Sequence, residues 1–234
     1  MEGPLALVGG DELNPGNEPQ DEVLVAAANG GPAYVLATAA ARQRPDLAVE
    51  HARKWFAKLG LQVEELPVRS RAEAGSKEVA AQAAQGRFFY LVGGDPGVTV
   101  DILIGTPVWS AIAAAWRDGA ALAGSSAGAM AMGAWSLVRG RYKGDDDRRF
   151  KDALGLVPRV AVAPHFESFG RRWAGSTQVE AREVVLVGID ERSAAVWIAG
   201  EWRAMGHGGV TVITNGDRVR FEAGQVISGM PHPA

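Results

Sequence analysis

The chain has 234 residues, of which 47% are hydrophobic and 22% charged, so it has enough apolar residues for a sizeable core and is not generally disordered. Its net charge of −3 gives no overall attraction for a nucleic-acid backbone, and we expect no nucleic-acid partner. The absence of cysteine excludes disulfides, thiolate metal sites and a cysteine nucleophile together.

The amino-terminal segment Met1–Pro4 has no basic residues ahead of its short apolar run and differs from a secretory signal, which favours a cytoplasmic location. Further along, the uncharged stretch 120–138 has about the length of a membrane span. It is mostly Ala, Gly and Ser, with too few large apolar residues to drive insertion. We therefore expect no membrane partner and interpret this stretch as a buried strand, turn and helix.

Strand-like and helix-like segments alternate through the first half of the chain. Strands are predicted at 5–8, 33–38, 61–66, 88–92 and 120–123, and helices at 21–28, 45–59, 72–85 and 107–117. This alternation predicts an α/β fold with a mostly parallel sheet and helices on both faces. Because ligands bind at the carboxyl ends of the strands in such sheets, functional residues are expected there.

The polar, charged segment 139–152 is typical of a surface loop and also suits a lid over a site. After it, strands are predicted at 157–162, 183–189, 194–198, 209–214 and 219–221, which makes the carboxyl-terminal part β-rich. No internal repeat or linker composition divides the chain. We therefore predict one α/β domain over residues 1–234, with 139–152 as its candidate lid.

The segment Gly124–Gly128 has the Gly-x-Ser-x-Gly pattern of a nucleophile elbow. Its glycines are needed because a side chain at either position would collide where the chain doubles back. Ser126 is the exposed hydroxyl of this pattern, and the N–H of Ala127 at the start of the next helix is placed to bind an oxyanion. A glycine-rich turn without chemistry is the alternative, and the strand before and the helix after favour the elbow.

A serine nucleophile needs a base, and the chain has four histidines. His165 follows a predicted strand, as expected for a catalytic residue, and His207 is the second candidate. His51 lies in the middle of a predicted helix and His232 lies near the carboxyl terminus, so neither is expected to be catalytic. The spacing of the four matches no zinc-binding pattern, and no metal site is predicted.

The base needs an orienting acid, and Asp190–Glu191 offers two carboxylates where a predicted strand ends. Glu191 is the better candidate, and the acidic run Asp145–Asp147 competes with it. The loop Gly93–Gly97 follows another strand, and its backbone N–H groups beside the elbow would complete an oxyanion hole. Neither this loop nor Gly9–Gly10 matches a nucleotide-binding pattern, so both are otherwise tight turns and no organic cofactor is expected.

Taken in order, these pieces resemble the serine peptidase family of cyanophycinase and dipeptidase E. The resemblance rests on the segments Leu91–Asp95, Gly124–Ala129, Pro164–Phe166 and Gly188–Glu191. It covers roughly residues 3–212. It implies a flavodoxin-like three-layer α/β fold of the class I glutamine-amidotransferase type, with serine in place of the cysteine of that fold.

The resemblance also implies roles for individual residues. Ser126 matches the family nucleophile, His165 its base, and Glu191 the acid that cyanophycinases carry in a Gly-Ile-Asp-Glu segment. Gly94 matches the oxyanion-loop glycine. In dipeptidase E the acid is an aspartate in the polar segment after the elbow, so Asp145–Asp147 stays an alternative.

Around the base, the chain departs from cyanophycinases, and its segment Ala163–Phe166 approaches the Asn-Pro-His-Phe of dipeptidase E. Cyanophycinases have Asp-Gln before the His-Phe pair and several arginines after it, whereas this chain has Ala163–Pro164 before it and only Arg171 and Arg172 after it. We therefore predict that it is not a cyanophycinase. Any preference for an acidic residue on the acyl side would come from Arg171, helped by Arg172, while Phe169 and Trp173 would make the pocket wall apolar.

The sequence thus predicts a serine peptidase that hydrolyses small peptides through an acyl-enzyme intermediate, without a metal or organic cofactor. An esterase or amidase acting on non-peptide acyl groups is one alternative, since the same constellation serves both. A binding module that has kept the fold and lost turnover is another. A homodimer is compatible with the sequence.

Overall fold

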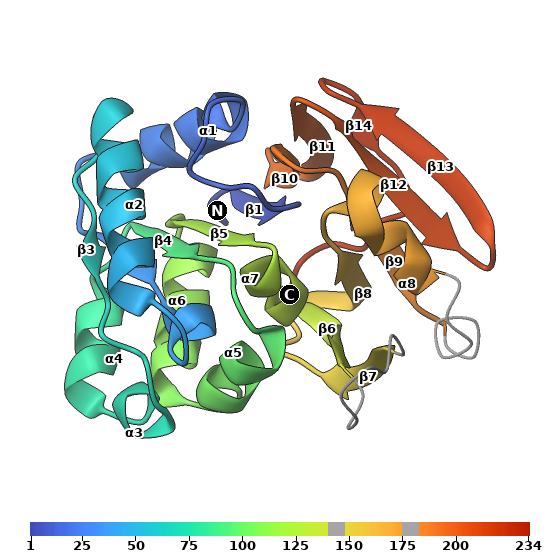
Figure 1. The fold of residues 1–234 in the computed structure, drawn as a ribbon. Coiled ribbons are helices and arrows are strands. Elements are labelled where there is room, and N and C mark those ends of the chain that lie inside the picture. Colours follow the sequence, from blue (N-terminus) through green and yellow to red (C-terminus); the bar gives the residue numbers. More distant parts are fainter. Residues whose placement is uncertain (140–147, 175–182) are drawn as a thin grey trace.

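The computed structural model describes residues 1–139, 148–174 and 183–234 (Figure 1). Within them, two mixed sheets carry the fold. The first has the order β14-β11-β10-β1-β5-β4-β2-β3. Its strands are β1 (Leu5–Val8), β2 (Ala33–Leu36), β3 (Glu64–Glu65), β4 (Phe88–Leu91), β5 (Ala121–Ser125), β10 (Ser193–Ile198), β11 (Glu201–Gly206) and β14 (Val226–Ile227).

The amino-terminal strands form the parallel part of the first sheet. β1, β5, β4, β2 and β3 pair parallel in that order, and β10 joins antiparallel at the other edge of β1, followed by β11 and β14. The predicted α/β fold with a mostly parallel sheet is confirmed. The carboxyl ends of β1, β5 and β4 therefore lie at one edge, beside one another.

Helices cover both faces of this sheet, as predicted (Figure 1). Side chains alternate along each strand, so Leu5 and Leu7 of β1 belong to the core on one face and Ala6 and Val8 to the core on the other. The first face carries α3 (Arg71–Ala74), α4 (Lys77–Ala84), α5 (Pro96–Leu103), α6 (Pro107–Arg117) and α7 (Ala127–Met132), and the second carries α1 (Glu18–Ala28) and α2 (Pro45–Lys58).

The β-rich later part forms a second sheet rather than an extension of the first. Its order is β13-β12-β9-β8-β6-β7, in which β6, β8 and β9 pair parallel. The strands are β6 (Gly133–Arg139), β7 (Arg148–Asp152), β8 (Val157–Ala163), β9 (Val185–Ile189), β12 (Gly209–Thr214) and β13 (Asp217–Glu222). Val160 and Val187 of this sheet pack in the same core as Leu5 and Leu7 of the first.

Several local predictions are corrected by the structure. The predicted helix 72–85 is two short helices, because Ser70 and Ser76 each accept a backbone N–H of the following turn and start a new helix. Helix α5 begins at Pro96, inside the predicted 93–97 turn, and the Asp95 side chain caps it by accepting the N–H groups of Gly97 and Val98. β6, β7, β11 and β14 were not predicted, and β6 begins at Gly133, within the stretch 120–138 that was interpreted as a strand, turn and helix.

The candidate lid 139–152 is shorter than its composition indicates. β6 extends to Arg139 and β7 begins at Arg148, so antiparallel pairing of β6 with β7 occupies both ends of the segment. The remaining part, with Asp145–Asp147, lies outside the described residues.

Among the described residues, no single helix combines the length and apolar composition needed to cross a membrane. α5 and α6 would qualify only as a pair, and they are bent by 95°. Val98, Ile112 and Trp116 of these two helices are buried in the core against the first sheet.

Candidate active site

Ser126 occupies a sharp turn between β5 and α7, with φ +48° and ψ −107°. A non-glycine residue seldom adopts such a backbone conformation, and it persists only where the surroundings impose it. A Cβ on Gly124 would lie 2.6 Å from the carbonyl carbon of Gly128, and one on Gly128 would lie 2.4 Å from the carbonyl oxygen of Leu91. The elbow therefore requires both glycines, for the steric reason that the sequence indicated.

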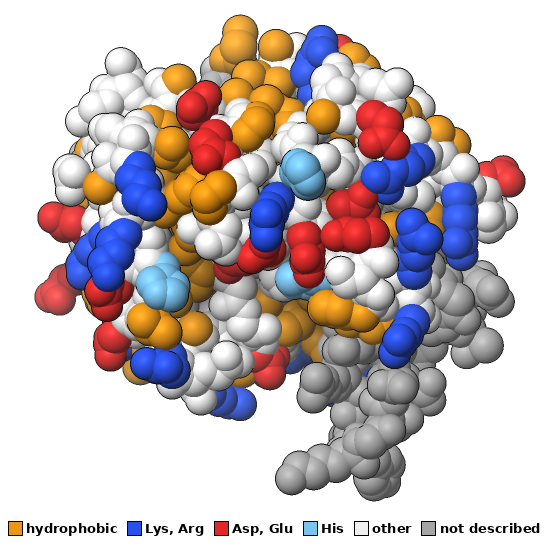
Figure 2. All heavy atoms as spheres, turned by 45° about the horizontal axis from the view of Figure 1, so that its top comes forward, with side chains coloured by type: hydrophobic (Ala, Val, Ile, Leu, Met, Phe, Trp, Pro, Cys, Tyr) orange, Lys and Arg blue, Asp and Glu red, His pale blue; other side chains and the backbone are white. Residues whose placement is uncertain are grey.

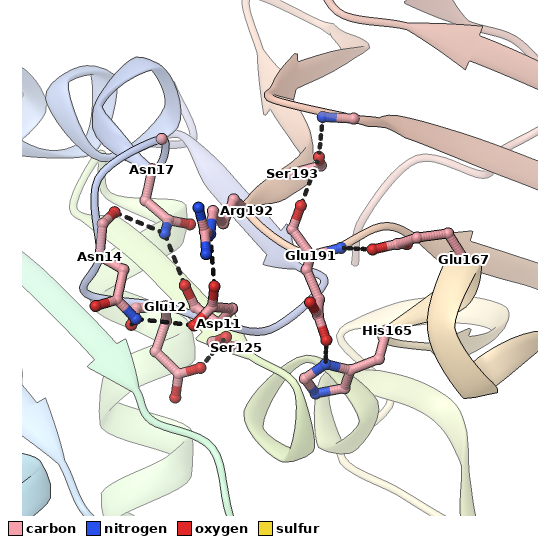
Figure 3. Close-up of polar contacts among 12 residues, drawn as sticks. Asp11, Glu12, Asn14, Asn17, Ser125, His165, Glu167, Glu191, Arg192 and Ser193 are labelled. Atoms are coloured by element: carbon pink, nitrogen blue, oxygen red, sulfur yellow. Dashed lines mark hydrogen bonds and ion pairs between the residues drawn. The ribbon is translucent and has the colours of Figure 1, made fainter.

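The serine, histidine and glutamate singled out in the sequence lie in contact. Ser126 Oγ is 3.1 Å from His165 Nε2, and His165 Nδ1 is 2.7 Å from Glu191 Oε1. Figure 3 shows the Glu191 carboxylate directed at the His165 ring. Since a carboxylate only accepts hydrogen bonds, Nδ1 carries the proton and Nε2 is left to accept the Ser126 hydroxyl.

His165 is held by the loop that follows β1. Its backbone has φ +50° and ψ +43°, and its N–H donates to the carbonyl of Gly9 at 2.7 Å. A Cβ on Gly10 would come 2.2 Å from Cε1 of the imidazole, so only glycine leaves room for the ring. On the ring itself, Phe169 stacks with centroids 4.9 Å apart.

The role of Gly10 was missed in the sequence, where Gly9–Gly10 was interpreted as a tight turn. The available signal was a glycine pair directly after the first parallel strand, at the edge where functional residues gather. What the sequence did not show is that His165, far along the chain, packs against it.

Hydrogen bonds also fix the backbone of Glu191 on both sides. Its N–H donates to Glu167 Oε1 at 3.0 Å, and its carbonyl accepts the Ser193 hydroxyl at 3.1 Å. Ser193 Oγ in turn accepts the N–H of Gly208 at 2.7 Å. Glu191 thus reaches the imidazole from an anchored turn (Figure 3).

Glu191 is preceded in the chain by Asp190, which forms an ion pair with Arg220. Asp190, whose side chain is 5% exposed, accepts Arg220 at 2.6 Å and the N–H of Gly209 at 3.0 Å. Burial is the largest single effect on Asp190 and opposes its ionisation, but the hydrogen bonds from Arg220 and the Gly209 N–H, the contact with Glu167 and the charge of Arg220 together outweigh it, so the pKa of Asp190 is lowered. The pKa of Glu167 is raised, first by its burial and then by its hydrogen bond with Asp190. Asp190 is therefore the ionised member of this carboxyl pair.

Two backbone groups near Ser126 suit an oxyanion. Ala127 opens α7, so its N–H has no acceptor within the helix. Gly94 has φ +146°, and a Cβ there would come 2.4 Å from the carbonyl oxygen of Ala39, so the loop after β4 also requires glycine. Gly94 and Ala127 line the same cavity as Ser126.

Two cavities reach both Ser126 and His165. The first, of about 370 Å³, has apolar walls formed by Pro96, Met130, Val138, Phe169 and Trp173. The second, of about 500 Å³, is lined in part by Glu12, Gln43, Arg44 and His51. Ser126 is therefore accessible from two hollows with different lining residues.

The two predicted substrate-binding arginines lie away from these cavities. The side chains of Arg171 and Arg172 are exposed and line neither hollow. The Arg171 guanidinium carbon is 5.8 Å from the centre of the Phe166 ring. Their predicted role in recognising an acidic residue stays a prediction.

The other histidines take no part in the Ser126 contacts. His51 of α2 lines the second cavity, and the backbone N–H of His207 donates to the carbonyl of Arg192. His232 packs edge-on against Trp197, with ring centroids 4.5 Å apart. Within the described part of the chain, no three His, Asp or Glu side chains are grouped as a metal site.

Figure 2 shows acidic, basic and apolar side chains interspersed over the face that it presents. On that face the described basic side chains do not gather into one surface of the kind that binds a polyanion.

Known proteins similar to this chain include cyanophycinases. That of Trichormus variabilis is 32% identical and that of Synechococcus elongatus 29% identical, each over 193 residues and 80% of this chain. The chain spans only 65% and 60%, respectively, of the length of these two relatives.

Solved structures and a family model cover more of the chain. The crystal structure of a peptidase from an acI-B1 Actinobacterium has a TM-score of 0.85 and 30% identity, and the match covers 98% of both chains. A putative peptidase E protein from Listeria monocytogenes shares the fold, with a TM-score of 0.57, 17% identity, and coverage of 95% of this chain and 99% of that one. The model of peptidase family S51 matches residues 5–204. These matches confirm the resemblance predicted from the motifs, and the chain belongs to peptidase family S51.

Proposed function

We propose that this protein is a serine peptidase that hydrolyses small peptides through an acyl-enzyme intermediate. The observation that carries the proposal is the unbroken series of contacts from Ser126 through His165 to Glu191, with the serine on a strained elbow. Membership of peptidase family S51 supports an amide bond as the substrate.

In the first half of the reaction Ser126 Oγ attacks the carbonyl carbon of the peptide bond while its proton passes to His165 Nε2. The negative charge that develops on the carbonyl oxygen is stabilised by the N–H groups of Ala127 and Gly94. His165 then gives the proton to the leaving amine as the C–N bond breaks. The carboxylate of Glu191 holds the ring and stabilises the imidazolium.

In the second half a water molecule attacks the acyl-enzyme ester, giving a proton to His165 Nε2. Collapse of this intermediate breaks the bond to Ser126 Oγ, which recovers its proton from His165. The carboxylic acid product leaves and the free enzyme is restored. Apart from the substrate and this water molecule, the proposed steps use side chains and backbone groups of this chain.

Glu191 is the acid in this proposal because it lies 2.7 Å from His165 Nδ1. The alternative acids, Asp145–Asp147, lie outside the described residues. A substitution of each, described in the Discussion, separates the two assignments.

The cavity walls favour short peptides with apolar or uncharged side chains. Phe169, Trp173 and Met130 line the first cavity beside Ser126, and among the lining residues that the structure describes Asp95 is the one charged carboxylate. A polymer of aspartate carrying arginine would place charged groups against the apolar side chains of Phe169, Trp173 and Met130, with a desolvation penalty. We therefore propose that cyanophycin is not the substrate.

The proposal is tested by labelling the purified protein with a fluorophosphonate probe and by offering dipeptides, tripeptides and blocked peptides. We expect the label on Ser126 and the appearance of cleaved peptides by mass spectrometry, with both lost in Ser126→Ala and retained in Ser125→Ala. Labelling with cleavage of simple esters alone would favour the esterase alternative. Failure of the parent protein to react at all would favour a binding module.

A further inference from the structure

The carboxylate of Glu12 connects two loops of the candidate site. Glu12 lies in the loop after β1, and Figure 3 shows its side chain extending to Ser125. Oε1 accepts the backbone N–H of Gly93 at 2.7 Å, and Oε2 accepts the Ser125 hydroxyl at 3.0 Å. These partners lie 81 and 113 positions further along the chain, so the contact is made by tertiary structure.

Both partners of Glu12 immediately precede groups that the proposed mechanism uses. Gly93 is followed by Gly94, whose N–H is a proposed oxyanion donor, and Ser125 is followed by Ser126, the proposed nucleophile. A single carboxylate therefore sets the distance between the oxyanion loop and the nucleophile elbow.

The space around Gly93 shows how closely these parts fit. A Cβ on Gly93 would lie 2.8 Å from Glu12 Oε1 and 3.5 Å from the Cβ of Ser126. The loop, the carboxylate and the nucleophile thus lie within van der Waals reach of one another. An oxyanion donor acts only at about 3 Å from the developing charge, and a displacement of about 1 Å costs roughly a hundredfold in rate.

We propose that Glu12 is a positioning residue of the peptidase site, which holds the oxyanion loop in register with the nucleophile elbow. The inference rests on the proposed peptidase function and extends it to a residue outside the Ser126, His165 and Glu191 series. A carboxylate suits this role because each of its two oxygens accepts one hydrogen bond, the first from the Gly93 N–H and the second from the Ser125 hydroxyl.

The test compares Glu12→Ala and Glu12→Gln with the parent, using the peptide that the parent cleaves best. Alanine removes both contacts. Glutamine keeps them, because its carbonyl accepts the Gly93 N–H and its amide donates to the Ser125 hydroxyl, which accepts as readily as it donates. We expect kcat to fall about a hundredfold in Glu12→Ala with KM changed less than about threefold, and Glu12→Gln to stay within about tenfold of the parent.

Two further variants separate positioning from general stability. Glu18→Ala is the matched control, because Glu18 accepts the N–H of Gly16 in the same segment at 2.5 Å and is not among the residues lining the two cavities. Its kcat should match the parent. Ser125→Ala loses one of the two contacts and should lose about tenfold in kcat. If Glu12→Ala does not fold, as judged by thermal melting, Ser125→Ala and Glu12→Gln still test the proposal.

Glu12 also lines the second cavity, which offers a competing role as a direct contact to a cationic substrate group. That role predicts a raised KM in Glu12→Gln and Glu12→Ala alike, confined to peptides with a free amino group, and this result would overturn the positioning role. A folded Glu12→Ala with the kcat of the parent would overturn it as well. If the parent itself cleaves no peptide and is not labelled at Ser126, the proposed function fails and this inference with it.

Discussion

The two sheets build the two halves of the candidate site in different ways. The first sheet supplies the loops after β1, β4 and β5, where Gly10, Gly94 and Gly124 leave no room for a Cβ. The second sheet supplies the ends of β8 and β9, where His165 and Glu191 lie beside Asp190 and its ion pair with Arg220. The nucleophile half thus depends on close packing, and the acid–base half depends on hydrogen bonds and charge.

Because of this difference, the two halves should respond differently to substitution. Backbone atoms packed at van der Waals distance have no flexible partner that yields, so an added methyl group displaces the chain itself. A network of hydrogen bonds and charges responds to the number of partners lost and to pH. Substitutions in the nucleophile half should therefore act by steric displacement, and substitutions in the acid–base half should act through lost partners and pH.

The largest effect is expected at the nucleophile. Ser126→Ala should lower kcat by on the order of a millionfold, because nothing else in the site forms the acyl-enzyme. Circular dichroism should show an unchanged fold. Ser125→Ala, its neighbour on the same turn, should lose far less, and activity of Ser126→Ala within tenfold of the parent would sink the acyl-enzyme mechanism.

The next largest effect is expected at the orienting acid. Glu191→Gln removes the charge that holds the protonated Nδ1 of His165, and a mispositioned imidazole costs on the order of ten-thousandfold in kcat. Single Asn substitutions of Asp145–Asp147 are the comparison set. An active Glu191→Gln beside one inactive aspartate variant would assign the acid to that aspartate instead.

The stability of the folded protein should depend on pH through Asp21. This side chain of α1 is fully buried, accepts the indole N–H of Trp55 at 2.7 Å, and has its pKa raised by burial to about 7. The native state then keeps a proton that the unfolded chain loses near pH 3.8, so stability falls as pH rises from 3.8 to about 7. The loss amounts to about 4 kcal/mol, or roughly a thousandfold in the folding equilibrium.

Urea unfolding of the parent and of Asp21→Asn at pH 5 and pH 8 measures this contribution. Asparagine accepts the Trp55 hydrogen bond without a charge, so its stability relative to the parent should be greater at pH 8 than at pH 5. The same difference at both pH values would show that Asp21 does not titrate between them.

A smaller loss of activity is expected where the two halves touch. Gly10→Ala places a methyl group against the His165 ring, and a shift of about 1 Å in the imidazole should cost roughly a hundredfold in kcat. Gly30→Ala is the matched control, since Gly30 also has positive φ but no atom within 4 Å of an added Cβ. Equal activity in the two variants would mean that the ring tolerates the displacement.

The smallest effect is expected at Arg171, which is exposed and lines neither cavity. A surface-exposed ion pair contributes at most about 1 kcal/mol, so Arg171→Ala should lower kcat/KM for a peptide with acyl-side Asp by no more than about fivefold. Peptides with acyl-side Ala and Leu should be unaffected. A selective loss of a hundredfold for Asp would place Arg171 against bound substrate.

Motifs that depend on nearby residues were predictable. The strand, the Gly124–Gly128 turn and the helix that follows are contiguous, so their pattern alone indicates Ser126. His165 follows a strand rich in β-branched and apolar residues, and that context distinguished it from His51 and His232. The preference for Glu191 over Asp145–Asp147 rested on the family resemblance as well as on its place at a strand end. The turn at 93–97 was recognised, but helix α5 was not, although Asp95 and Pro96 form a typical helix start.

Local sequence patterns were enough to predict which side chains form the candidate site, because the Gly124–Gly128 turn and the strand ends are set by steric preferences of neighbouring residues and by alternating burial. Tertiary structure alone decided the second sheet, the packing of Gly10 against His165, and the bridge from Glu12 to Gly93 and Ser125. Each of these joins residues far apart in the chain, and no local pattern encodes which distant partner fills a given space. These contacts form only when the loops of both sheets meet at one edge of the core.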